Sequence, residues 1–113
     1  MPAYVLEAEI ELGEGTDPRA VGAAVTVELC GHWEHEGPCA WPHNSAIDAD
    51  QTPALFRTIY VADQDEERAI RDRIARSLNQ AGDWRVEGVR ARPIADDERD
   101  LADRLARGPR RPR

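Results

Sequence analysis

The amino-acid sequence predicts one small α+β domain, whose elements follow one another as strand, helix, strand, strand, helix and strand, with a further helix at the C-terminus. Apolar residues from Tyr4 to Leu12 alternate with glutamates, a pattern typical of a strand buried on one face. Ile70, Ile74 and Leu78 recur every four residues, which predicts a helix with one apolar side. A length of 113 residues suits a single domain.

The first helix is expected over residues 17–35. Asp17 is a suitable N-cap, and Pro18 suits the first helical position. The apolar stripe of this helix consists of Val21, Ala24, Val25 and Leu29. Gly37-Pro38 is expected to end the helix, because a glycine followed by a proline is typical of helix C-termini. Gly31 offers an earlier end, since a glycine inside a helix costs about 1 kcal/mol relative to alanine.

The other elements follow from the same kinds of pattern. Residues 39–49 are expected to be extended and partly irregular, with Pro42 suited to an edge strand. The later elements are, in order, a strand over 55–61, a helix that begins in the acidic segment 63–67 and ends at 81–82, a strand over 84–94 with a bulge near Gly88, and a helix over 96–107.

The order of these elements resembles the ferredoxin-like βαββαβ arrangement, an antiparallel sheet with two helices on one face. The resemblance covers about residues 4–94 and rests on element order, so it implies a fold and no particular function. The chain then divides into a ferredoxin-like domain over residues 1–95 and a C-terminal helix with a flexible, arginine-rich tail over residues 96–113.

In that arrangement the first strand lies between the third and fourth strands, and its glutamates face away from the two helices. These glutamates are Glu7, Glu9 and Glu11, and their expected cross-strand partners are Arg57, Arg85, Arg90 and Arg92. The C-terminal helix is expected to cover this face through Leu101 and Leu105, unless a second subunit does so.

One segment concentrates the residues that bind metals or titrate near neutral pH. Residues 30–43 hold both cysteines, all three histidines and two of the three tryptophans of the chain. Thiolate and imidazole are the ligands of zinc and related transition metals. The spacing is neither that of a standard zinc finger nor the H-E-x-x-H motif of zinc proteases. The candidate metal ligands are Cys30, His32, His35, Cys39 and His43.

Two alternative C-terminal ends of the first helix imply two different sets of metal ligands. If the helix runs to His35, Cys30 and His32 point about 200° apart and cannot share one ion. The set is then His32, His35, Cys39 and His43. If the helix ends at Gly31, the set is Cys30 and Cys39 with two histidines. A closed set of four protein ligands is typical of structural zinc, whereas three ligands and a water near Glu34 or Glu36 favour catalysis.

Two further interpretations of residues 30–43 require no metal. The cysteines and tryptophans can simply close the end of a small core, or Cys30 and Cys39 can form a disulfide, which suits an oxidising compartment. No phosphate-binding glycine loop and no nucleophile motif occurs in the chain.

The charge and hydropathy of the chain argue against two classes of partner, nucleic acids and membranes. A net charge of −7 argues against a broad nucleic-acid-binding surface, and no apolar run approaches the roughly 20 residues of a membrane span. No secretory signal is evident at residues 1–4, so we expect a cytoplasmic protein with reduced cysteines.

The leading hypothesis is a small non-enzymatic binding or assembly module with zinc or another divalent transition metal in the segment after the first helix. The alternatives are a small enzyme or small-molecule-binding domain, with its cleft at Trp33, Trp41 and His43, and a metal-free oligomeric interaction protein such as a homodimer. The dimer would be built on Phe56, Thr58 and Tyr60 or on Leu101 and Leu105.

Overall fold

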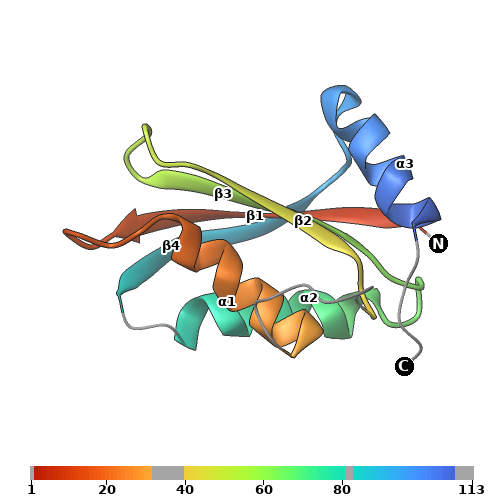
Figure 1. Cartoon of the computed structure of the whole chain (residues 1–113), viewed down its shortest axis with the longest axis horizontal. Coiled ribbons are helices and arrows are strands. Elements are labelled where there is room, and N and C mark those ends of the chain that lie inside the picture. Colours follow the sequence, from red (N-terminus) through yellow and green to blue (C-terminus); the bar gives the residue numbers. More distant parts are fainter. Residues whose placement is uncertain (1, 32–39, 81–82, 109–113) are drawn as a thin grey trace.

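A computed structural model describes residues 2–31, 40–80 and 83–108 of the chain. Its centre is one antiparallel sheet with the strand order β2-β3-β1-β4 (Figure 1). The strands are β1 (Ala3–Leu12), β2 (His43–Asp48), β3 (Ala54–Val61) and β4 (Trp84–Arg92). The fold is therefore α+β, and the predicted place of the first strand between the third and fourth is confirmed.

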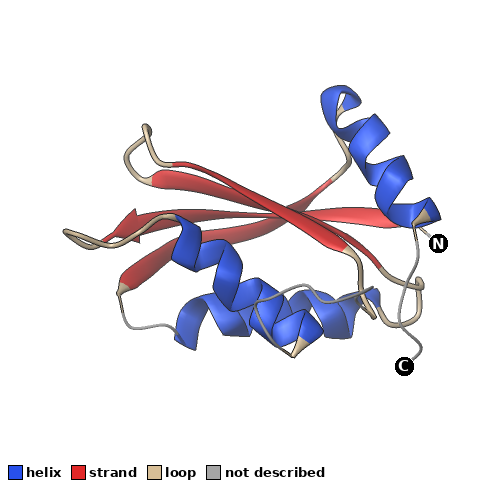
Figure 2. Cartoon of the chain, in the orientation of Figure 1, coloured by secondary structure: helices blue, strands red, loops and turns tan. Residues whose placement is uncertain are grey.

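The helices lie on both faces of this sheet. The helices α1 (Arg19–Cys30) and α2 (Glu67–Gln80) share one face, and α3 (Arg99–Arg107) lies on the other (Figure 2). A short 3-10 turn, Asp96–Glu98, leads into α3. The edge position of β2, directly after Pro42, is confirmed. The predicted bulge in β4 is also confirmed, because the register with β1 shifts directly after the pair formed by Glu9 and Gly88.

The predicted C-terminal end of the first helix is wrong. The helix ends at Cys30 instead of residue 35, because Gly31 takes a left-handed conformation (φ +83°) and donates its N–H to the carbonyl of Val27. A side chain from α2 stabilises the same turn, since Arg73 donates a hydrogen bond of 2.7 Å to the carbonyl of Glu28. The start is close to prediction: the Asp17 carboxylate accepts the N–H of Arg19.

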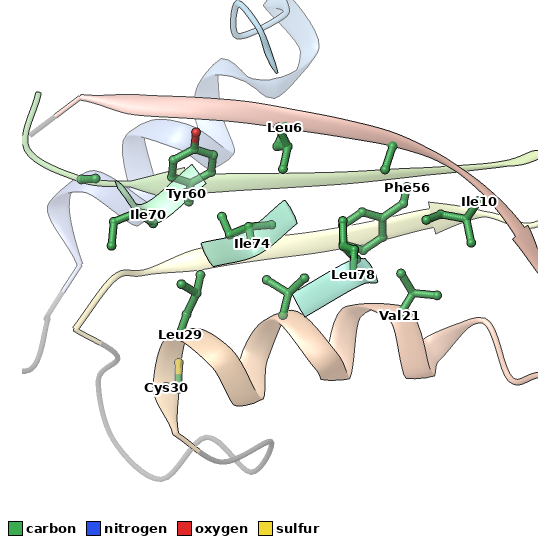
Figure 3. Packing of buried hydrophobic residues seen from close by; sticks show 13 residues of the cluster. Leu6, Ile10, Val21, Leu29, Cys30, Phe56, Tyr60, Ile70, Ile74 and Leu78 are labelled. Carbon is green, nitrogen blue, oxygen red and sulfur yellow. The ribbon is translucent and has the colours of Figure 1, made fainter. Parts of the chain in front are cut away.

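The main core lies between the sheet and the pair α1 and α2 (Figure 3). Alternate residues of β1 face the helices, which bury Leu6 and Ile10 almost completely. The predicted apolar side of the second helix is confirmed, because Ile70, Ile74 and Leu78 are all buried. At one end of the core the hydroxyl of Tyr60 donates a 2.5 Å hydrogen bond to Glu67.

Phe56 and Tyr60 belong to this core, and Thr58 between them is a buried polar residue on the same face. All three side chains are buried beneath the helices of their own chain, so the prediction that they form a dimer interface is wrong. The reason is the alternation of β3, whose even-numbered residues face the helices.

The opposite face of the sheet carries a network of ion pairs. Glu7 accepts contacts of 2.7 Å from both Arg90 and Arg92, and Arg90 also reaches Glu9. At the far end of the face Arg85 pairs with Glu11 and Glu87. The predicted face of Glu7, Glu9 and Glu11 and their pairing with arginines of β4 are thus confirmed.

The α3 helix covers one end of this charged face. Its apolar residues Leu101, Ala102 and Leu105 pack on Val5 and Ile59, in a small cluster separate from the main core. This confirms that the C-terminal helix covers the sheet through Leu101 and Leu105.

The turn before α3 is fixed by Glu98. Both oxygens of Glu98 accept hydrogen bonds from Arg92, at 2.6 and 2.8 Å, and Oε1 also accepts the N–H of Ala95. Arg57 differs from prediction, because its nearest carboxylate is Glu98 and not a glutamate of β1.

The left-handed conformation of Gly31 at the end of α1 predicts whether replacing this glycine raises or lowers the stability of the protein. Gly31→Ala places a side chain in the left-handed region, so we expect it to destabilise the protein by about 1–2 kcal/mol in urea unfolding. Gly88→Ala, in open space and at an ordinary backbone angle, is the control. A helix that continued to residue 35 would instead be stabilised by Gly31→Ala, because alanine is the better helix former.

The hydrogen bonds of Glu98 predict that the stability of the protein falls at acidic pH. Hydrogen bonds from Arg92, with help from the Ala95 N–H and Arg57, lower the pKa of Glu98 to about 2, from an ordinary value of 4.5. Because the pKa is lower in the folded state, the stabilisation is complete above about pH 4.5 and is lost as the pH falls towards 2. We expect Glu98→Gln to cost about 1.5–3 kcal/mol at pH 7 and to flatten the stability profile between pH 4.5 and 2. An unchanged acid profile would contradict this role.

Candidate functional site

The candidate site is the junction where α1 ends and β2 begins. The chain leaves α1 at Gly31 and returns at Ala40, a buried residue that precedes β2. Thr26 of α1 and His43 of β2 lie within hydrogen-bond distance, 3.1 Å between Oγ1 and Nε2. The two ends of the intervening segment are therefore held at the same end of the molecule.

Cys30 is the last residue of α1. It is almost fully buried, packs in the main core and is disulfide-bonded (Figure 3). Cys39, the one other cysteine of the chain, lies outside the described residues. A disulfide sulfur is not a thiolate, so Cys30 in this form does not offer a metal the ligand that the sequence suggested.

His43 is held through both ring nitrogens. Its Nδ1 lies 3.1 Å from the carbonyl oxygen of Trp41, which can only accept a hydrogen bond, so Nδ1 carries the proton. In the neutral ring Nε2 then accepts the hydroxyl proton of Thr26. This arrangement fixes the tautomer and orientation of the ring, and binding a metal through Nε2 requires Thr26 to give up its contact.

Trp41 is clamped by α2 next to His43. The guanidinium of Arg73 lies 4.7 Å from the centroid of the Trp41 ring and also pairs with the carboxylate of Glu28 at 3.1 Å. This cation–π contact joins the returning segment to both helices. The indole Nε1 of Trp41 is buried, and no described residue forms a hydrogen bond with it.

The structure describes only two of the five predicted ligands, Cys30 and His43. Cys30 and His43 lie at the two ends of the segment, while His32, His35 and Cys39 lie outside the described residues, as do Trp33, Glu34 and Glu36. Within residues 2–31, 40–80 and 83–108, no three His, Cys, Asp or Glu side chains converge as a metal site.

One pocket in the described part of the chain lies away from this junction. A pocket of about 260 Å³ opens at the N-terminal end of α1, with Gly22, Ser45 and Phe56 among its lining residues. It does not include Trp41 or His43, around which the sequence predicted a small-molecule cleft. The Arg19 side chain at its rim is held by the Asp17 carboxylate.

Sequence reasoning missed the contribution of Thr26 and Arg73. Thr26 looks like an ordinary exposed helix residue, and Arg73 lies 45 residues from Glu28 along the chain. Their contacts arise only when α1 and α2 pack side by side, for which a single sequence carries no signal.

Comparison of this chain with protein-family models, with curated proteins and with solved structures found no match. Among the helices described here, none combines the length and the apolar composition needed to cross a bilayer. The geometry of the junction is therefore the main indication of function.

The Thr26–His43 contact yields a testable prediction. Thr26→Val removes the hydroxyl but nearly preserves shape and helix propensity, so we expect a loss of about 0.5–1.5 kcal/mol in unfolding free energy. Thr26→Ser, which keeps the hydroxyl, is the matched control. In nitrogen-15 spectra of the wild type we expect the Nδ1-protonated tautomer of His43; a predominant Nε2-protonated ring would disprove the proposed orientation.

Proposed function

We propose that this protein is a small non-enzymatic binding module whose segment 30–43 binds one zinc or other divalent transition-metal ion when its cysteines are reduced. The scaffold is proposed to be of the ferredoxin-like class. The element order and the strand order β2-β3-β1-β4 support that assignment.

The main support is the convergence of the two ends of the segment. Thr26 and His43 approach within 3.1 Å, so the chain leaves and re-enters the fold at one place. Every cysteine and histidine of the protein lies between Cys30 and His43. A short segment with closed ends keeps such ligands at high local concentration, which favours one shared ion.

The end of α1 bears on the choice of ligands. Cys30 and His32 would point apart only in a helix that continues to residue 35, and α1 ends at Cys30. The proposed set is therefore Cys30 and Cys39 with two of the three histidines. The set His32, His35, Cys39 and His43 is the alternative, and variants distinguish the two.

Oxidation state then controls the site. Cys30 is disulfide-bonded in the structure, and a metal needs its thiolate. Metal binding and the disulfide thus exclude each other. The metal-bound form therefore belongs to a reducing compartment such as the cytoplasm, whereas the disulfide-bonded form in the structure suits an oxidising one.

The test is metal binding to reduced and oxidised protein. We expect one equivalent of zinc to bind to protein kept under a non-thiol reductant at pH 7.5, and none to bind to the oxidised protein. Affinity should fall as the pH drops through the range in which histidine is protonated. The measurements are elemental analysis after gel filtration and competition with a chromophoric chelator.

Variants assign the ligands and supply the control. Cys39→Ala should abolish binding in either set, whereas Cys30→Ala abolishes it only if Cys30 is a ligand. Asn44→Ala, an exposed neighbour of His43, should bind like the wild type. Reduced wild-type protein that binds no zinc, copper, nickel or cobalt at pH 7.5 would end the proposal.

A further inference from the structure

The sheet face under α3 contains an arginine, Arg57, one of whose guanidinium nitrogens is buried and unpaired among the described residues. The Arg57 side chain is only 19% exposed, and its buried Nη1 atom has no hydrogen-bond partner within residues 2–31, 40–80 and 83–108. Its one ion pair in the described part of the chain is a contact of 3.5 Å from Nε to Glu98, which is longer than a good hydrogen bond. A guanidinium has five N–H donors, and leaving them unpaired in a buried place is unfavourable.

Glu98 does not supply an acceptor to Nη1 of Arg57, because its hydrogen bonds go to other donors. Its Oε1 already accepts hydrogen bonds from Arg92 and from the N–H of Ala95, and its Oε2 accepts the second hydrogen bond from Arg92. Glu7, the residue paired with Arg57 in the sheet register, uses its two oxygens for Arg90 and Arg92. A two-oxygen carboxylate thus occupies a place where two guanidinium groups meet.

We propose that Arg57 and Arg92 form a binding site for a phosphate group, and that Glu98 occupies this site in place of the ligand. A phosphate group has three or four oxygens, so it can accept the fork of Arg92 and still offer acceptors to Arg57. The site is local and does not require the broad basic surface that the net charge of −7 argues against.

Access to the site requires Glu98 to move, and the packing of α3 allows this. Within α3 only Ala102 is fully buried, while Leu101 and Leu105 are half-buried. Their cluster with Val5 and Ile59 is separate from the main core, so α3 can shift without opening the space between the sheet and the other two helices (Figures 1 and 3). Phosphate binding is therefore coupled to release of α3 from the sheet.

The experiment is a titration of nitrogen-15-labelled protein with inorganic phosphate at constant ionic strength, with chloride as the balancing anion. The reporters are the Nε–H signals of Arg57 and Arg92 and the backbone amides of residues 99–107. Glu98→Ala removes the competing carboxylate, so we expect it to bind phosphate about tenfold or more tightly than the wild type. Arg57→Met should abolish this binding in the Glu98→Ala background.

Two matched variants separate the site from general electrostatics. Asp97→Ala removes the same charge from the same turn, but Asp97 is exposed, and we expect wild-type affinity. Arg85→Gln, at the far end of the same sheet face, should leave the phosphate affinity of Glu98→Ala unchanged. Should Glu98→Ala fail to fold, Glu98→Gln serves in its place.

Phosphoserine amide, titrated in parallel, distinguishes two sources of the phosphate group. Tighter binding of the ester assigns a phosphorylated chain as the ligand, and equal binding assigns the free ion; either result supports the site. The inference is overturned if phosphate shifts the arginine signals no more than chloride does in Glu98→Ala, or if Asp97→Ala gains affinity equally. This site lies on the opposite face of the sheet from α1 and stands or falls independently of metal binding.

Discussion

The buried carboxylate of Glu7 is the interaction on which one face of this fold depends. Glu7 lies in the middle of the central strand and is only 8% exposed. A carboxylate in such a place is strongly unfavourable unless charged hydrogen-bond donors surround it. Arg90 and Arg92 supply these donors from β4, and Arg92 in turn binds Glu98. One ionic chain therefore joins the central strand, the edge strand and the turn that positions α3.

The two faces of the sheet are stabilised in different ways. Towards α1 and α2 the contacts are apolar and continuous, from Leu6 and Ile10 to Ile74 and Leu78. Towards α3 they are ionic, with a small apolar cluster at one end. This division places the two proposed sites on opposite sides of the sheet. The junction of α1 and β2 lies at the edge of the apolar core, and the arginine pair lies beneath α3.

Local periodicity was sufficient to predict most of the fold. The alternation in β1 and the four-residue spacing of Ile70, Ile74 and Leu78 depend on which side of an element is buried, and each pattern is complete within its own element. The end of α1 was not predictable in this way, because both Gly31 and Gly37-Pro38 are plausible stops. Its last turn is stabilised by Arg73, which comes from another helix.

Less of the candidate site could be predicted, because its contacts also come from elements that are distant in the sequence. Residue types identified Cys30 and His43 as potential ligands, but not the disulfide of Cys30 or the two hydrogen bonds that orient His43. Likewise, Glu98 was expected only as a residue of the C-terminal helix over 96–107. Its contacts with Arg57 and Arg92 exist because β3 and β4 lie on either side of β1, an arrangement that sequence patterns imply only through the fold as a whole.

The most direct test of this account is a double-mutant cycle on Glu7 and Arg92 with Glu7→Gln and Arg92→Gln, measured by urea unfolding at pH 7. If the ionic chain holds the charged face together, the two substitutions should be strongly non-additive, with a coupling of about 1–3 kcal/mol. The same cycle on the exposed pair Glu11 and Arg85 should give a clearly smaller coupling. Additive effects at Glu7 and Arg92, no larger in coupling than those of the exposed pair, would contradict the account.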